Sequence, residues 1–332
     1  MITPCLVMTF YMLPRQFLEF GEQKRFFLYN YIDLLIVDEA GQVSPEIAAG
    51  AFSLAKKSVI VVDVYQIEPV WSVSRAMDKA LAVSNGAIQS LDEFDLLEQT
   101  GLNSSRSSVM KVAAKCCKYE KFDEKGLFLS EHRRCYNEII DYCNMLVYKG
   151  NLQPMSGNGK EDEKIAIKHW PQMGFKQIDT EYSSRKGSSR ENRLEAEQIA
   201  EWLKNNFKFI TNTYPKEVKE NLIGIITPFK AQVECIKSEL KKQVPTNHSK
   251  ISVGTVHTFQ GTERKIIILS TVYGKNDGCF FIDANKSLMN VAVSRAKDNF
   301  FMFGDINCLK ETQSSASGLL KRCLNADTVV TD

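Results

Sequence analysis

Long apolar runs, histidines and paired cysteine motifs are scarce in these 332 residues. The longest apolar runs fall far short of the roughly 20 residues that a membrane-spanning helix needs, so no membrane contact is expected. The four histidines and nine scattered cysteines, none in a Cys-x-x-Cys pair, disfavour a structural zinc site. An odd number of unpatterned cysteines is typical of reduced thiols, which predicts a cytoplasmic protein.

A strong excess of charge of one sign is also lacking. Lysine and arginine number 42 against 40 acidic residues, which leaves a formal net charge of +2. No global basic field therefore attracts nucleic acid, and any such surface must be local. The length permits two domains, and the 44% hydrophobic and 25% charged composition is ordinary for a globular protein.

The phosphate-binding loop Gly-x-x-x-x-Gly-Lys-Ser/Thr is absent from the sequence. The feature that usually accompanies it is present, because Asp38-Glu39 directly follows the apolar run Leu34–Val37. A buried strand of this kind would deliver both carboxylates to its carboxyl end, where they could hold Mg²⁺ and activate a water. Taken alone, an Asp-Glu pair is more often a solvated one.

A second apolar run, Ser58–Val62, ends at Asp63. This repetition favours the functional interpretation of Asp38-Glu39. Gln66, three residues further on, could reach a terminal phosphate or the water that attacks it.

Apolar strands alternate with helical patterns along the chain, which predicts α/β domains whose parallel sheets are covered on both faces. The junction of two domains is expected near residues 120–128. The predicted strands are 4–9, 33–38, 58–62, 127–129, 222–226, 266–271 and 300–303. The predicted helices follow residue 14 and cover 44–54, 135–147 and 191–206, and the predicted polar loops are 102–106, 156–164 and 180–192.

Four further stretches carry candidate chemistry. His132-Arg133-Arg134 could neutralise a phosphoryl group, although a surface basic cluster is the simpler alternative. The stretch 253–263 includes Gly261, which allows a close backbone approach, and Glu263, which could contact a nucleotide. In the same stretch Thr255 and His257 could contact a nucleic-acid backbone, unless the stretch is only a polar loop.

The last two stretches are 227–232 and 290–297. Thr227 starts a helix after strand 222–226 and suits phosphate capture, whereas Phe229 is expected to pack in the core rather than stack on a base. Arg295, among small residues on a helix, could act as an arginine finger or form a surface ion pair.

These five stretches, in this order and spacing, resemble superfamily 1 helicases of the nonsense-mediated-decay and Okazaki-fragment type (superfamily 1B), especially large bacterial members. The resemblance runs from about Pro4 to Asp305. It implies two RecA-like P-loop NTPase domains, 1–125 and 126–332, the first of them N-terminally truncated. It also implies ATP and Mg²⁺ in the cleft between the domains, and 5′→3′ movement on single-stranded DNA or RNA.

The resemblance also implies roles for individual positions of this sequence. Asp38 would bind Mg²⁺, Glu39 would activate the water, and Gln66, after Asp63, would sense the γ-phosphate. Arg133 and Arg295 would reach the phosphates from the second domain, where Gly261 and Glu263 would line the nucleotide. Thr227, Thr255 and His257 are the expected contacts to nucleic acid.

This sequence departs from the family pattern in three places. Val62 stands where Gly usually precedes the aspartate, and Glu131-His132-Arg133 replaces Gln-Tyr-Arg. The segment that carries the phosphate loop upstream of Pro4 is missing, so a truncated first domain or a partner chain that supplies the loop is expected. Two alternatives to the helicase interpretation remain: an inactive module that binds nucleic acid or protein, and a split-chain defence component.

Overall fold

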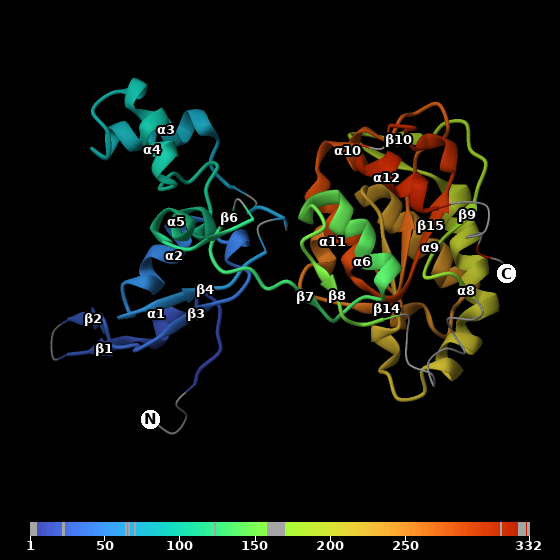
Figure 1. Cartoon of the computed structure of the whole chain (residues 1–332), viewed down its shortest axis with the longest axis horizontal. Coiled ribbons are helices and arrows are strands. Elements are labelled where there is room, and N and C mark those ends of the chain that lie inside the picture. Colours follow the sequence, from blue (N-terminus) through green and yellow to red (C-terminus); the bar gives the residue numbers. More distant parts are fainter. Residues whose placement is uncertain are drawn as a thin grey trace. The chain divides into compact units, whose positions relative to one another are not determined.

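The structure is a computed structural model that describes all residues except 1–4, 22–23, 64, 66, 70, 123, 158–169, 313, 325–329 and 331–332. The chain divides into two compact units, Met1–Phe128 and Leu129–Asp332, and many of their elements are labelled in Figure 1. The sequence places the junction at 125/126, three residues before this boundary. The interpretation of the first unit as a truncated RecA-like domain stays a prediction.

The first unit combines short strands with short helices. Its strands are β1 (Leu18–Phe20), β2 (Arg25–Phe27), β3 (Leu35–Val37), β4 (Ser58–Ile60), β5 (Glu120–Lys121) and β6 (Glu124–Lys125). Its helices are α1 (Leu13–Gln16), α2 (Pro45–Phe52), α3 (Arg75–Ser84), α4 (Phe94–Thr100) and α5 (Val109–Cys116). Strands β3 and β4 pair in parallel, with Ile36 opposite Val59. Two of this unit's hydrophobic clusters contain only four buried residues each.

One face of the β3–β4 pair is exposed. Ile36 is 64% exposed and its partner Val59 is 48% exposed, and Leu34 and Val61 are exposed as well. Parallel sheets in globular proteins are normally covered on both faces, so this face is unusual for its apolar character.

The second unit is larger. Its strands are β7 (Glu131–His132), β8 (Gln153–Pro154), β9 (Met173–Gln177), β10 (Ser184–Lys186), β11 (Ser189–Glu191), β12 (Ile223–Ile226), β13 (Ser252–Gly254), β14 (Arg264–Ser270) and β15 (Ala296–Gly304). Its helices are α6 (Asn137–Cys143), α8 (Arg193–Thr213), α9 (Lys230–Gln243), α10 (Phe280–Ala284), α11 (Lys286–Ser294) and α12 (Ala316–Cys323). A π-helical segment, Asn144–Tyr148, continues α6.

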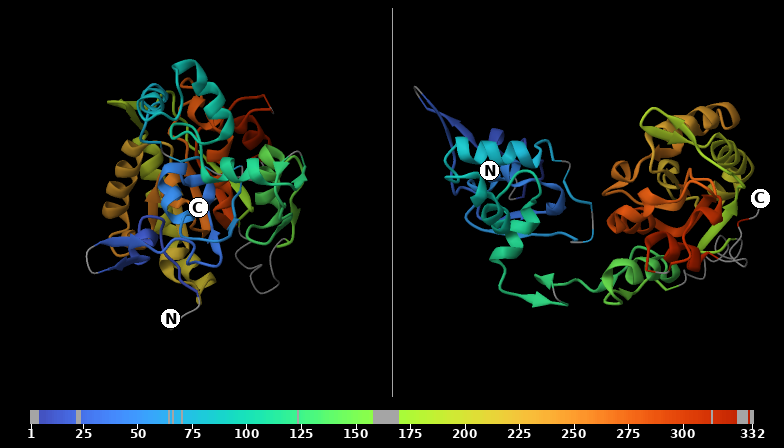
Figure 2. Two further views of the ribbon diagram at one scale, coloured as in Figure 1. Left: turned by 90° about the vertical axis from the view of Figure 1, so that its left-hand side faces the viewer. Right: turned by 90° about the horizontal axis from the view of Figure 1, so that it is seen from above.

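Five of these strands form one parallel sheet in the order β13-β12-β14-β15-β9. Helices α8 and α9 lie on one face of this sheet and α6 and α11 on the other (Figures 1 and 2). The predicted α/β class with a parallel sheet is therefore confirmed.

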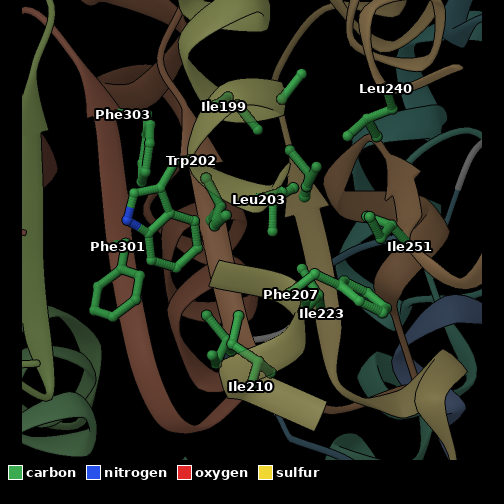
Figure 3. Packing of buried hydrophobic residues seen from close by; sticks show 14 of the residues in the cluster. Ile199, Trp202, Leu203, Phe207, Ile210, Ile223, Leu240, Ile251, Phe301 and Phe303 are labelled. Carbon is green, nitrogen blue, oxygen red and sulfur yellow. The ribbon is translucent and has the colours of Figure 1, made fainter. Parts of the chain in front are cut away.

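Trp202 is the centre of the core under α8. Its ring lies 5.8 Å from that of Phe301 and 5.7 Å from that of Phe303, with both contacts edge-to-face (Figure 3). The helix presents Ile199, Trp202, Leu203 and Ile210 to the sheet at the spacing expected of an amphipathic helix.

Three sequence predictions of local structure are wrong. Residues 5–9 form no strand, and Val7 is 95% exposed, since none of the described strands pairs with this segment. Residues 127–129 form no strand either: Leu127 and Leu129 are more than 80% exposed at the boundary of the units. The stretch 180–192 contains the hairpin β10–β11 rather than only a loop.

Candidate functional site

The carboxylates of the first unit follow a paired strand, as the apolar run predicts. Asp38 comes directly after β3 and is exposed, and its Oδ1 accepts a hydrogen bond of 2.9 Å from the Glu39 amide. Glu39 has a left-handed backbone (φ 54°, ψ 36°) and accepts 2.9 Å from Gln42 Nε2. A non-glycine residue in this region costs about 1 kcal/mol or more, and such strain is common at functional turns.

Asp63 lies near the end of the neighbouring strand. Directly after β4, the backbone is still hydrogen-bonded to the end of β3, because Val61 N donates to Val37 O at 2.7 Å. The half-buried Asp63 accepts a hydrogen bond of 3.0 Å from the amide of Tyr65. Both carboxylates therefore follow the carboxyl ends of paired parallel strands. The predicted phosphate sensor, Gln66, lies outside the described residues.

A magnesium ligand fits this arrangement. No group of three or more histidine, cysteine or acidic side chains in the described part of the chain could hold a metal by itself. Mg²⁺ needs fewer, because it keeps several waters and takes one or two carboxylates together with substrate phosphates. The exposed carboxylate of Asp38, at the end of a strand, has the chemistry of such a ligand.

In the second unit, an ion-pair cluster lies at the amino end of the sheet, where Glu263 directly precedes β14 and Lys297 is the second residue of β15. Glu263 contacts Lys297 Nζ through Oε1 and Arg134 Nε through Oε2, the latter at 3.0 Å. Burial raises the pKa of Glu263, but the hydrogen bond from Lys297 and the charges of Lys297 and Arg134 outweigh it and hold the pKa below its usual value. Glu263 is thus ionised at neutral pH and fixes both cations.

Arg133 is more exposed to solvent than its neighbour Arg134. Its side chain is 65% exposed, and it contacts Glu131 Oε2 through Nη2 at 2.7 Å and through Nε at 3.2 Å. His132 adds no charge here: burial, then the charge of Arg134, lowers its pKa to about 4. Of the three basic residues 132–134, the two arginines carry the positive charge at pH 7.

Arg295 differs from the expected exposed finger. It follows the last residue of α11 and is only 2% exposed. Its Nη1 donates to the carbonyl of Thr262 at 3.3 Å, which joins α11 to the 261–263 turn. In this structure the guanidinium is therefore a buried support for that turn, and its role toward a phosphate stays a prediction.

A cavity of about 350 Å³ lies next to the same turn. Gly261, Glu263, Lys265 and Lys297 are among the residues that line it. Gly261 has φ +72°, and a Cβ there would meet nothing within 4 Å. Glycine is therefore favoured here by the backbone conformation of the turn and not by close packing. Both lysines are paired with carboxylates, Lys297 with Glu263 and Lys265 with Asp298 at 3.3 Å, so the lining is polar and carries charges of both signs.

The three predicted nucleic-acid contacts lie at or just beyond the carboxyl end of the sheet. Thr227 follows β12 and Thr255 follows β13, whose ends are paired. His257 is exposed and Thr255 is half-buried. Thr227 is completely buried, and its hydroxyl has no hydrogen-bond partner among the described residues. Only Thr255 and His257 therefore reach the surface.

Sequence reasoning left two residues of the site without a role, Arg134 and Lys297. Both occur inside quoted stretches, and both carry a charge opposite to that of Glu263. Arg134 pairs with Glu263 across more than a hundred residues of sequence, and Lys297 pairs with it from the neighbouring strand, so only the fold reveals both contacts.

The family match and the relatives given below, together with the parallel sheet, the Asp-Glu strand end and the four stretches of the second unit, indicate a superfamily 1B helicase-type region. The chain belongs to the AAA_12 family, described as AAA domain, which matches residues 106–307. The predicted resemblance is thereby confirmed at the level of the superfamily.

Curated relatives agree with this class. The chain is 27% identical over 287 residues to the DNA replication ATP-dependent helicase/nuclease DNA2 of Gallus gallus, covering 86% of this chain and 24% of that protein. It is 27% identical over 290 residues to the Regulator of nonsense transcripts 1 homolog of Drosophila melanogaster, covering 84% of this chain and 21% of that protein. The chain thus spans at most about a quarter of the length of these two relatives.

A solved structure, the C-terminal domain of a possible DNA helicase from Lactobacillus plantarum, matches 60% of this chain and 99% of its own length, with a TM-score of 0.35 and 14% identity. Within the described residues, no helix is long and apolar enough to cross a membrane.

Proposed function

We propose that this chain is part of an ATP-dependent helicase or translocase of superfamily 1 that moves 5′→3′ along single-stranded DNA or RNA. The observation that carries the proposal is the strand-end placement of Asp38, Glu39 and Asp63 in a chain whose second unit has the family's charged turn at Glu263. Family membership supports it independently.

Each unit would contribute a different part of the chemistry. In the first unit Asp38 would hold Mg²⁺, Glu39 would take the proton of the attacking water, and Asp63 would help to bind the nucleotide. In the second unit Arg133 and Arg295 would stabilise charge on the phosphates, while Gly261 and Glu263 would line the nucleotide. Gln66 is proposed from the sequence alone as the γ-phosphate sensor.

Single-stranded nucleic acid is the proposed partner. Thr255 and His257 lie on or near the surface beyond the carboxyl end of the sheet and would contact its backbone. Thr227 would join them only if the residues that bury it moved. A further segment or chain that supplies a phosphate loop is also proposed, because the sequence contains none.

A binding module without turnover is the second candidate. The observation that favours it is the same lack of Gly-x-x-x-x-Gly-Lys-Ser/Thr in a sequence that keeps the other stretches. Such a module would hold single-stranded nucleic acid or a protein partner.

ATP hydrolysis by this chain, with and without single-stranded DNA or RNA, separates the two candidates. Turnover stimulated by a strand supports the motor. Strand binding without turnover supports the binding module, or a motor that needs a phosphate loop from elsewhere. Adding a segment that carries the loop then decides, since only a motor gains turnover.

Variants of the active preparation test the individual roles. Glu39→Gln is expected to abolish turnover while ATP still binds, because the amide cannot take a proton from water. Arg133→Ala is expected to reduce turnover by on the order of a thousandfold. Glu131→Ala, which removes the only described ion-pair partner of Arg133, is the matched control and should keep turnover. Full activity in Glu39→Gln would refute the assignment.

A further inference from the structure

Aromatic side chains from three separate segments meet at the carboxyl end of the second unit's sheet. Phe229 lies just after β12, Tyr273 after β14, and Phe281 in α10. The ring of Phe229 is 5.5 Å from that of Tyr273 and 5.7 Å from that of Phe281. Tyr273 Oη also accepts a hydrogen bond of 3.3 Å from the amide of Phe281. These contacts fix the beginning of α10 on the end of the sheet.

The aromatic residues of this cluster and its neighbour Phe280 differ in solvent exposure. Tyr273 is 4% exposed, Phe281 is 37% exposed, and the adjacent Phe280 is 80% exposed. The buried members account for the packing, so phenylalanine at position 280 adds nothing to the core. A large aromatic side chain left in water on a rigid support is a candidate contact for a ligand with a flat apolar face.

Positive charge surrounds this cluster. The guanidinium of Arg190, in β11, lies 5.7 Å from the ring of Tyr273. Arg185, exposed in β10, is directly opposite Arg190 in the hairpin. Lys230, next to Phe229, is exposed too.

Two neighbouring carboxylates are already paired. Asp277 neutralises Arg190 at 2.8 Å, and Asp283 neutralises Lys310 at 2.9 Å, so neither is left to pair with Arg185 or Lys230. Within the described part of the chain, neither Arg185 nor Lys230 forms an ion pair. The segments that carry the aromatic cluster therefore also carry two cations without a carboxylate partner, Lys230 next to Phe229 and Arg185 opposite Arg190, a combination found in proteins that bind unpaired strands.

We infer that Phe280 stacks on an unpaired base of single-stranded nucleic acid whose phosphates lie near Arg185 and Lys230. This contact rests on the proposed function and adds a base-stacking position to the backbone contacts of Thr255 and His257. Stacking tolerates any base, since each presents a π-face, so the contact would serve movement along a strand without sequence preference.

The test compares two fluorescein-labelled strands of about 15 nucleotides, an oligothymidylate and a strand with abasic sites throughout, by anisotropy with the full chain. Phe280→Ala is expected to weaken binding of oligothymidylate by roughly fivefold or more and to leave the abasic strand unaffected. Lys230→Ala should weaken both strands alike, with a shallower salt dependence. Val218→Ala is the matched control: it removes an exposed apolar side chain before β12, at the other end of the sheet, and should change neither.

Three outcomes would overturn the inference. Unchanged oligothymidylate binding in Phe280→Ala leaves the proposed function standing without the stacking contact. An equal loss on both strands means that the side chain acts on the backbone or the fold. A change in sedimentation mass without a change in strand binding assigns Phe280 to a protein interface. If the unaltered chain binds neither strand, the nucleic-acid part of the proposed function fails as well.

Discussion

Glu195 is a completely buried carboxyl group in the first turn of α8, outside the candidate site. It accepts hydrogen bonds from Ser270 Oγ at 2.5 Å and from the amide of Val272 at 2.9 Å. Burial raises its pKa to about 8, and the hydrogen bonds lower it only in part. The group is therefore protonated in the folded protein at neutral pH, while in the unfolded chain it is ionised.

This difference predicts a pH-dependent stability. Because the pKa is raised on folding, the contribution of Glu195 is complete below about pH 4.5 and is lost progressively as the pH rises to about 8. The free energy of unfolding should fall by roughly 1 kcal/mol per pH unit in this range from this group alone. Urea unfolding followed by tryptophan fluorescence measures it, since Trp170 and Trp202 lie in the second unit's core.

Glu195→Gln is the matched variant, because it keeps the shape and cannot ionise. Its unfolding free energy should depend less on pH between 5 and 8 than that of the unaltered chain. Equal slopes for the two proteins would show that Glu195 is ionised in the folded state.

Single residues could be placed from the sequence where they follow an apolar run. Asp38 and Thr227 lie directly after paired strands because their positions depend only on where a strand ends. The burial of Arg295 and of Glu195 could not be predicted. Glu195 is enclosed by residues 75–77 positions away, and such packing leaves no periodic trace in the sequence.

Strand β12 and the short helix η6 (Val256–Phe259) meet at a glycine. A Cβ on Gly224 would lie 2.5 Å from Phe259 Cε1 and 2.8 Å from Ile267 Cδ1. The missing side chain thus lets Phe259 pack against the sheet, immediately before the turn that holds Gly261 and Glu263.

Gly224→Ala is expected to lower the free energy of unfolding by about 1–3 kcal/mol, because the methyl group overfills a packed site. Thermal unfolding measures this. Gly50→Ala in α2 is the control: its Cβ would meet only Pro14 Cγ at 3.6 Å, so the variant should be neutral or more stable, as expected for a helical site. Equal stability of Gly224→Ala and the unaltered chain would mean that the close packing of Phe259 on Gly224 does not stabilise the position of η6.

Whole elements were predictable when they were long and apolar. Strands β12, β14 and β15 and helix α8 follow their patterns, although β15 begins four residues earlier than predicted and α8 ends seven residues later. The edge strand β9 reads Met-Gly-Phe-Lys-Gln and lacks an apolar run, and the hairpin β10–β11 is polar throughout. Their strand conformation depends on partners rather than on composition.

At the scale of the whole molecule, the two units differ in their cores. One cluster of the second unit contains 22 buried residues, whereas the clusters of the first unit around α2 contain four each. Residues 129–332 expressed alone should therefore unfold cooperatively, and residues 1–128 should show a broad transition or none. Calorimetry of the two pieces checks this. A sharp transition in the first piece would contradict it.

The exposed face of β3 and β4 predicts a second property of the full chain. Ile36 and Val59 should bind an apolar dye such as 8-anilinonaphthalene-1-sulfonate and promote self-association. Ile36→Thr with Val59→Thr should reduce dye fluorescence and the association seen in sedimentation, since threonine keeps the branched shape. Val218→Thr, in the second unit, is the control. Unchanged dye binding in the double variant would place the apolar surface elsewhere.

The strand order of the five-stranded sheet determines which strands can pair while the chain is being translated. Strand β9 is made first, yet its partner is β15, with Met173 beside Phe300. On the ribosome β9 must wait for more than a hundred further residues before it can pair, while β12, β13 and β14 can already associate. The last strand to be translated, β15, therefore closes the sheet, and a chain interrupted before it would leave β9 without a partner.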